Sequence, residues 1–187
     1  MTELILVDEQ DNIVGTAEKM LVHQAGMLHR AFSIFVFRKK NNNIQLLLQK
    51  RNINKYHSGG LWTNSCCGHP SLNQEIILSA GNRLQEELGM DIKLYYLDRF
   101  VYKAKIKNNN YNTLIEHEVD HVFVGIYKED TVMFNHNEVD AIKWIDINIF
   151  EQELLNYPEN FTAWVGLAWG IVKKNLLFIN NLLQAVI

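Results

Sequence analysis

Apolar residues recur along this chain in short blocks that are separated by polar, turn-forming residues. Six blocks have the length and β-branched or aromatic content of strands: LILVD near the start, AFSIFVF (31–37), IQLLLQ (44–49), FVYKAKI (100–106), the run 115–127, and IKWID (142–146). Asn runs at 41–43 and 108–110 each lie between two such blocks, an arrangement typical of hairpin turns. The pattern predicts a mixed β-sheet.

Two helices are predicted from a different periodicity. Between about 74 and 88, apolar residues recur at helical spacing and should face the core: Ile77, Ala80, Leu84 and Leu88. Gly89 follows the last turn, where a glycine commonly ends a helix. A second helical region begins at about Phe161, and its last part, NLLFINNLLQAVI, reads as an amphipathic helix.

Strands, a central helix, more strands and a terminal helix favour an α/β (α+β) fold in a single domain. The chain has 187 residues, of which 48% are hydrophobic and 21% charged, a balance typical of a globular protein with a substantial core. We find no internal repeat and no proline-rich linker. One domain over 1–187 is therefore expected.

Charge and composition exclude several classes of function. A net charge of −3 argues against a general nucleic-acid binder, which needs a broad basic surface. The acidic start MTELILVDEQD lacks the features of a secretory signal, and no stretch reaches the apolar length of a membrane span. The adjacent Cys66 and Cys67 cannot join distant parts of the chain by a disulfide. We expect a reduced, cytoplasmic protein without a nucleic-acid or membrane partner.

The central helix carries a charged face. Arg83 and Glu87 lie four residues apart, on the side opposite the apolar stripe, and could simply form a solvated ion pair. The spacing from Gly68 through Arg83 to Gly89, however, resembles the Nudix box, with its Glu-Glu-x-Gly end intact. Gln74 replaces an early Glu of that signature, and Asn82-Arg83 replaces its Arg-Glu pair. These changes should weaken metal-assisted attack by water while retaining diphosphate binding.

A second group of polar residues suits a metal ion. In IEHEV, Glu116 and Glu118 share one face of a strand, which requires either solvent or a cation between them. Together with three histidines they form a nitrogen and oxygen set that suits Zn²⁺ or Mn²⁺: His23, His29 and His69. Sequence spacing alone does not show that these residues converge. His117 and His121 are interpreted as structural.

Basic residues flank the cysteine segment. Lys19, Arg51 and Lys55 lie near strand ends and in a glycine-containing loop, where anions commonly bind, although solvated side chains are the alternative. Whether either cysteine binds a metal, reacts with a substrate or fills space stays open from the residues alone.

Taken together, the chain from about Glu18 to Trp164 resembles type I isopentenyl-diphosphate isomerase, a Nudix-fold family. The motifs that carry the resemblance are EK-x3-H…H-x-AFS, KR-x3-K…GLWTNSCCGHP, R-x2-EELG, E-x-E-V and F-x2-W. It implies a Nudix-type mixed sheet sandwiched by helices, with a core at about 30–165 and a C-terminal helical extension at about 166–187.

The resemblance also implies the reaction and the residues for it. Isopentenyl diphosphate would be converted into dimethylallyl diphosphate by protonation and deprotonation through a tertiary carbocation. Cys67 and Glu118 would be the acid–base pair, Tyr102 a partner of Glu118, and Trp164 the stabiliser of the cation. Cys66 reads as a small hydrophobic residue.

Binding roles follow from the same resemblance. The diphosphate would be held by four basic residues together with a Mg²⁺ at Glu87: Lys19, Arg51, Lys55 and Arg83. A separate Mn²⁺ or Zn²⁺ would bind His23, His29, His69, Glu116 and Glu118. The protein is expected to be a monomer or a homodimer.

Three other functions are weighed against this one. A Nudix diphosphate hydrolase shares the fold but needs the complete carboxylate box, which Gln74 and Asn82-Arg83 interrupt. A zinc-binding interaction module would need a structural site with Cys66 or Cys67, and no Cys-x2-Cys pair is present. A thiol hydrolase built on Cys67 and a histidine lacks an identifiable oxyanion site.

Overall fold

One mixed β-sheet organises the protein in the computed structural model, which describes residues 2–107 and 113–185. Its strands are β1 (Glu3–Val7), β2 (Ile13–Glu18), β3 (His29–Lys40), β4 (Asn43–Arg51), β5 (Trp62–Thr63), β6 (Cys66–Gly68), β7 (Leu94–Lys107), β8 (Thr113–Ile126) and β9 (Val139–Asp146). The helices are α1 (Lys19–Ala25), α2 (Ile76–Leu88), α3 (Ile147–Asn156), α4 (Val165–Lys174) and α5 (Leu176–Ala185), with a 3₁₀ turn at Pro158–Asn160.

Strand β3 is the centre of the sheet. On one side it pairs in parallel with β8, and His29 lies opposite Glu118 in this register. On its other side it pairs first with β6 and then, farther along, with β4, both antiparallel. The long hairpin of β7 and β8 extends the sheet on one side and β9 extends it beyond β4. This topology brings residues from most of the chain to the two ends of β3.

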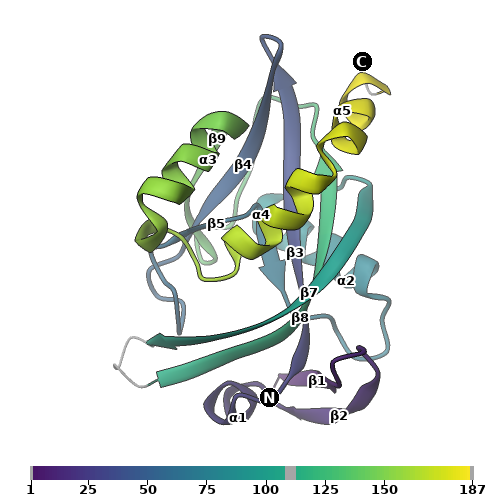
Figure 1. Cartoon of the computed structure of the whole chain (residues 1–187), viewed down its shortest axis with the longest axis vertical. Helices are drawn as coiled ribbons and strands as arrows, with labels where there is room; N and C mark the ends of the chain where they lie inside the picture. The colour runs from purple at the N-terminus through teal and green to yellow at the C-terminus, as the bar shows by residue number, and fades with distance from the viewer. Residues whose placement is uncertain (1, 108–112, 186–187) are drawn as a thin grey trace.

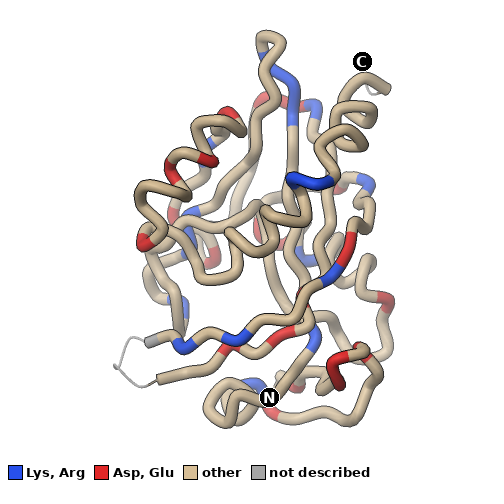
Figure 2. The backbone as a smooth tube through the Cα atoms, viewed as in Figure 1, with Lys and Arg blue, Asp and Glu red and all other residues tan. Residues whose placement is uncertain are grey.

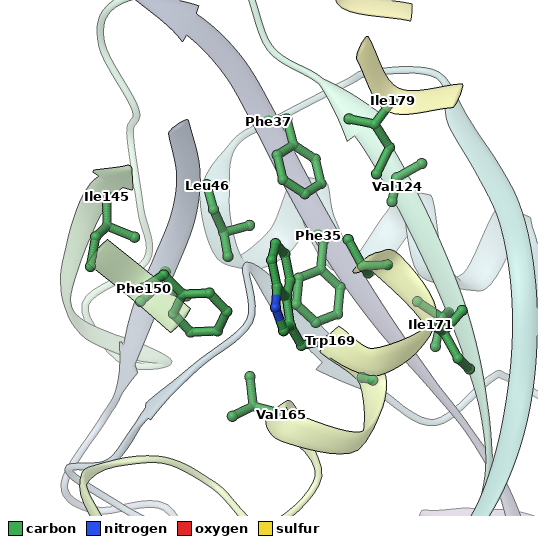
Figure 3. Packing of buried hydrophobic residues seen from close by; sticks show 14 of the residues in the cluster. Phe35, Phe37, Leu46, Val124, Ile145, Phe150, Val165, Trp169, Ile171 and Ile179 are labelled. Carbon is green, nitrogen blue, oxygen red and sulfur yellow. The ribbon is translucent and has the colours of Figure 1, made fainter. Parts of the chain in front are cut away.

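Helices cover both faces of the sheet (Figure 1). Because side chains alternate along a strand, Phe35 and Phe37 enter one core cluster while Ile34 and Val36 enter the other. The first cluster lies under α3, α4 and α5, where Trp169 packs against Phe35, Phe37 and Phe150 (Figure 3). Helix α2 supplies Ala80, Leu84 and Leu88 to the second. The expected Nudix-type sheet between helices is confirmed.

The two Asn runs have different outcomes. Asn41 and Asn42 turn the chain between β3 and β4 with φ of 51° and 64°, the left-handed region that asparagine tolerates, so this hairpin is confirmed. The second run at 108–110 lies outside the described residues. The strands on either side of it, β7 and β8, pair as a hairpin.

Several details of the helix prediction were wrong. Helix α2 begins at Ile76, near the predicted start at about 74, but Ile77 is 38% exposed, because Ile76 is the residue of the first turn that packs on the core. The second helical region begins at Val165, since Phe161 is extended and bridges to Trp62. Gly89 does end α2, with φ of 65°. Strand β2, helix α1 and helix α3 were not predicted.

Charges of both signs are distributed over the backbone in the view of Figure 2, with only acidic residues on α3 and only basic residues on α4. Within 2–107 and 113–185, no helix is both long and apolar enough to cross a membrane.

Candidate active site

A cavity of about 660 Å³ opens at the end of the sheet where β3 begins. The predicted site residues that line it come from α1, the β4–β5 segment, β6, α2, β7, β8 and the start of α4: Lys19, Arg51, Lys55, Cys67, His69, Arg83, Glu87, Tyr102, Glu116, Glu118 and Trp164. The two remaining predicted residues, His23 and His29, are fully buried and lie against its carboxylates. The fold therefore brings all of the predicted site residues into one region.

The predicted metal ligands converge. His23 from α1, His29 from β3, His69 after β6, and Glu116 and Glu118 from β8 each offer one ligand atom, and these atoms lie within 4.8 Å of one another. The parallel register of β3 and β8 places His29 beside Glu118, and the alternation of β8 puts both carboxylates on one face. His117 points elsewhere, and its Nδ1 donates to the carbonyl oxygen of Gly26 over 3.0 Å.

The chemistry of this donor set fits a cation. His23 Nδ1 lies 2.6 Å from the carbonyl oxygen of Lys19, and His29 Nδ1 lies 2.9 Å from that of Met27. A carbonyl oxygen only accepts, so each Nδ1 carries the proton and each Nε2 faces the cluster. His29 Nε2 and His69 Nε2 are only 3.2 Å apart, so they cannot both carry a proton. Ring lone pairs and carboxylates meeting in one buried place suit Zn²⁺ or Mn²⁺.

The pKa shifts within this group of residues also favour binding of a cation. Burial lowers the pKa of His69 to about 4, which leaves its ring neutral at pH 7. Burial would raise the pKa of Glu116, but the neighbouring rings of His23 and His57 hold it well below its usual value. Burial and the charge of Glu116 would likewise raise the pKa of Glu118, and the neighbouring rings of His29 and His69 bring it below its usual value. Both carboxylates are therefore ionised.

Basic side chains form the anion-binding part of the cavity. Lys19, Arg51, Lys55 and Arg83 line it, and burial followed by the charge of Lys55 lowers the pKa of Lys19. Arg83 Nη2 lies 2.5 Å from Glu87 Oε1, so the predicted i,i+4 pair is formed. Glu87 is only 3% exposed, so the alternative of a fully solvated ion pair does not hold for it, and Gln49 donates to Glu87 Oε2 over 3.0 Å.

Glu138 is a residue of this cluster that the sequence did not reveal. It precedes β9, lines the cavity, binds Lys55 and lies 2.5 Å from Arg83 Nη2. Its carboxylate thus lies between two of the basic residues expected to hold the diphosphate. The signal for it was weak, because NHNEVD reads as an ordinary turn before a strand.

Cys67 and Glu118 open into the same cavity, on either side of β3. Burial raises the pKa of Cys67 to about 12, so its thiol keeps its proton at neutral pH, and Arg51 Nη1 lies 3.5 Å from its sulfur. Glu118 Oε2 accepts a hydrogen bond of 2.6 Å from the Tyr102 hydroxyl, which stands directly opposite on β7. A protonated thiol and an ionised carboxylate are an acid and a base ready for proton transfer.

Trp164 closes one wall of the cavity. Its indole nitrogen donates to Asn64 Oδ1 over 3.1 Å, and the Arg51 guanidinium carbon lies 5.5 Å from its ring centroid. Because Trp164 is 4% exposed and also lines the cavity, it both packs in the interior and presents part of its ring to the cavity.

Three more side chains near the site were missed because they lie outside every motif used above. Tyr56 and His57, in the segment between β4 and β5, contact the candidate metal ligands: the Tyr56 hydroxyl lies 3.3 Å from His23 Nε2, and His57 Nε2 lies 2.8 Å from Glu116 Oε1. Asp120 is a third, buried one alternation after Glu118, where it accepts from the Ser33 hydroxyl over 2.8 Å. Burial and the charge of Glu118 raise the pKa of Asp120 well above its usual value.

Comparison with known proteins identifies the fold class first. The NUDIX domain family matches residues 27–165. Among solved structures, a protein from Deinococcus radiodurans superposes with a TM-score of 0.70 at 16% identity, over 91% of this chain and 99% of that one. An Ap4A hydrolase from C. elegans superposes with a TM-score of 0.57 at 16% identity, over 79% and 97%. At these identities the structural likeness concerns the fold alone, and this protein is a NUDIX-domain protein.

Relatives in sequence narrow the assignment. Isopentenyl-diphosphate Delta-isomerase 2 of Photorhabdus laumondii is 48% identical over 161 residues, 86% of each chain. Isopentenyl-diphosphate Delta-isomerase of Serratia proteamaculans is 45% identical over 161 residues, again 86% of each. The chain belongs to the isopentenyl-diphosphate Delta-isomerase family.

Proposed function

We propose that this protein is an enzyme that converts isopentenyl diphosphate into dimethylallyl diphosphate. The observation that carries the proposal is the pairing of a protonated Cys67 thiol with an ionised Glu118 carboxylate in one cavity that also holds four basic residues. An unactivated alkene must gain one proton and lose another from the neighbouring carbon, which requires an acid and a base at the same site. The relatives named above support this activity.

The proton transfers are assigned to Cys67 and Glu118. Tyr102 holds Glu118 through its 2.6 Å hydrogen bond and so fixes the direction of the carboxylate. Trp164 presents its ring to the carbon skeleton, where its quadrupole stabilises a developing positive charge and its bulk excludes water. Capture of the cation by water would give an alcohol, so the reaction requires that water is excluded from the carbocation.

The diphosphate is assigned to the basic side of the cavity. Lys19, Arg51, Lys55 and Arg83 offer charge-assisted hydrogen bonds, and the guanidinium groups can bind phosphate oxygens in pairs. Glu87 would supply a carboxylate to a Mg²⁺ bound with the diphosphate. This division places the anion at α2 and the alkene at the Cys67–Glu118 end.

The cluster of three histidines and two glutamates would hold a second divalent ion, for which we propose Mn²⁺ or Zn²⁺ from its nitrogen and oxygen donors. When bound, such an ion supplies positive charge that keeps Glu118 ionised and fixed. We further propose that the protein acts in the cytoplasm on this small substrate, as a monomer or homodimer, without a nucleic-acid or membrane partner.

The test is proton NMR of isopentenyl diphosphate incubated with the purified protein and Mg²⁺ in D₂O. The expected result is loss of the terminal methylene signals as dimethylallyl diphosphate carrying deuterium appears. A substrate that stays unchanged with Mg²⁺, Mn²⁺ and Zn²⁺ supplied, while a panel of nucleoside diphosphate compounds is hydrolysed, would instead identify a Nudix hydrolase.

A further inference from the structure

The segment between β4 and β5 places a fourth histidine against the metal cluster. His57 is 4% exposed, and its Nε2 lies 2.8 Å from Glu116 Oε1. It stands outside the set of five convergent ligand atoms, so its contact is with a ligand and not with the centre of the cluster. A buried side chain that touches the site through another residue calls for an explanation.

The hydrogen bonds of His57 fix which ring nitrogen carries the proton. Glu116 is ionised and can only accept, so Nε2 donates to it. His57 Nδ1 lies 3.2 Å from the Ser58 hydroxyl, which can donate to it. The ring is also held edge-on by Tyr56 at 4.2 Å and by Trp164 at 6.3 Å between ring centroids. Its direction toward Glu116 is therefore well defined.

This hydrogen bond gives the two carboxylate oxygens of Glu116 different surroundings. Oε1 is occupied by His57, whereas Oε2 is buried and has no hydrogen-bond partner within the described residues. His23 Nε2 lies 3.5 Å from Oε2, on the side where the ligand atoms converge. An ionised, buried oxygen without a hydrogen bond is costly unless a cation completes its surroundings.

We propose that His57 is a positioning residue for the metal site, which donates a hydrogen bond to Glu116 Oε1 and so directs Oε2 to the cation. The inference rests on the cation site of the proposed function but not on the isomerisation itself. Such partners of metal ligands orient the ligand and raise the affinity of the site.

The backbone around His57 is held independently of the cluster. Asn52 accepts from the backbone N–H of Asn54 and donates to the carbonyl oxygen of His136, and the N–H of Ile53 binds Asp140 Oδ2. The N–H of Gly60 closes the segment onto the carbonyl oxygen of Arg51 over 2.9 Å. A fixed loop places the His57 ring without help from a bound ion, as a preorganised site requires.

The experiment replaces the imidazole ring of His57 with the amide side chain of either Gln or Asn and compares the two variants. In Gln the amide nitrogen stands at about the reach of histidine Nε2, and in Asn at that of Nδ1, so His57→Gln keeps the donor to Glu116 and His57→Asn loses it. Metal-free protein is titrated with Mn²⁺ by calorimetry, and with Co²⁺ by visible absorption. We expect H57N to weaken Mn²⁺ binding about tenfold to a hundredfold and to alter the Co²⁺ spectrum, while H57Q stays within about threefold.

His121→Gln is the matched control, since His121 is also buried but binds Asp11 at 3.0 Å, outside the cluster. It should leave Mn²⁺ affinity unchanged. Equal Mn²⁺ affinity of H57N and the unaltered protein overturns the proposal, and so does equal loss in H57Q and H57N, which would make His57 itself a ligand. The proposal is also overturned if the unaltered protein does not bind Mn²⁺, or if it binds Mn²⁺ at a site that His69→Gln leaves intact. None of these readouts needs turnover, so a failed isomerase assay leaves this inference standing.

Discussion

Cys66 and Cys67 are neighbours in the chain, yet a strand sends their side chains to opposite faces. Cys66 is fully buried, its sulfur 3.5 Å from Glu87 Oε2, and burial raises its pKa well above the usual value. Cys67 lines the cavity beside Arg51. The same residue type therefore fills space at one position and meets the substrate cavity at the next.

The two thiols give a matched pair of variants. Cys67→Ala should lower kcat for isomerisation by about 10²- to 10⁴-fold, the usual contribution of a general acid or base, with the fold intact. Cys66→Ala should leave kcat little changed. Steady-state assays with melting temperatures for both variants make the comparison. Comparable loss of activity in a folded Cys66→Ala protein would mean that the reactive thiol had been assigned to the wrong cysteine.

The sequence predicted some of the residues that gather at the site and missed others. Cys67, Glu118 and Arg83 lie inside specific motifs, so the sequence predicted one shared site for them, and all three line the same cavity. His57 and Glu138 were missed, since each acts through a partner distant in the chain: His57 through Glu116, and Glu138 through Lys55 and Arg83. A contact of this kind leaves no local pattern, and only the folded sheet reveals it.

At the level of elements, the strands were easier to predict than the short helices. β3, β4, β7 and β8 are long strands, and each contains a block rich in β-branched, aromatic or other apolar residues that the sequence pattern reveals. Helix α1 has only 7 residues and is stabilised by its ends, with Glu18 accepting from the backbone N–H of Leu21 and Gly26 in the left-handed region at φ 65°. Its helical pattern is too short to stand out from a loop, so the element that carries His23 was missed.

Replacement by alanine should change the free energy of unfolding in opposite directions at two glycines. A Cβ at Gly59 would lie 2.5 Å from the carbonyl oxygen of Ile53, so Gly59→Ala must open the segment that carries Lys55 and His57. We expect a loss of about 1–3 kcal/mol in the free energy of unfolding. Gly170 is exposed in α4 with nothing within 4 Å of a Cβ, and Gly170→Ala should add about 0.4–1 kcal/mol.

Urea denaturation of both glycine variants and the unaltered protein measures these changes. Binding of inorganic pyrophosphate with Mg²⁺ should weaken in Gly59→Ala and stay unchanged in Gly170→Ala. A Gly59→Ala protein as stable as the unaltered one would show that the β4–β5 segment is not the fixed support inferred from its hydrogen bonds.

Burial of titratable groups in the site makes the stability of the whole molecule depend on pH. The pKa of His69 is about 4 in the folded protein and about 6.5 in the unfolded chain, because burial disfavours the charged ring. Below pH 6.5 the unfolded chain therefore takes up a proton that the folded protein does not, so stability falls as the pH drops from 6.5 toward 4. At pH 5 this one group lowers the free energy of unfolding by about 2 kcal/mol.

His69→Gln removes that titration and should flatten the decline in stability between pH 7 and pH 5 in metal-free protein. His29 acts in the opposite sense: burial would lower its pKa, but Glu118 raises it overall, so acid strengthens that contact. Urea denaturation at several pH values with a chelator present is the measurement. Parallel pH profiles for the variant and the unaltered protein would contradict the assignment to His69.

The parallel ladder of β3 and β8 has a consequence for how the protein forms. It joins strands remote in the chain; the hydrogen-bonded Ser33 and Asp120, for example, are 87 residues apart. Pairings of such long sequence separation form slowly, because a large loop must close before any contact rewards it. His29 can meet Glu118 only once this ladder exists, so the ability to capture a cation should arise late in refolding, together with the native sheet and not before it.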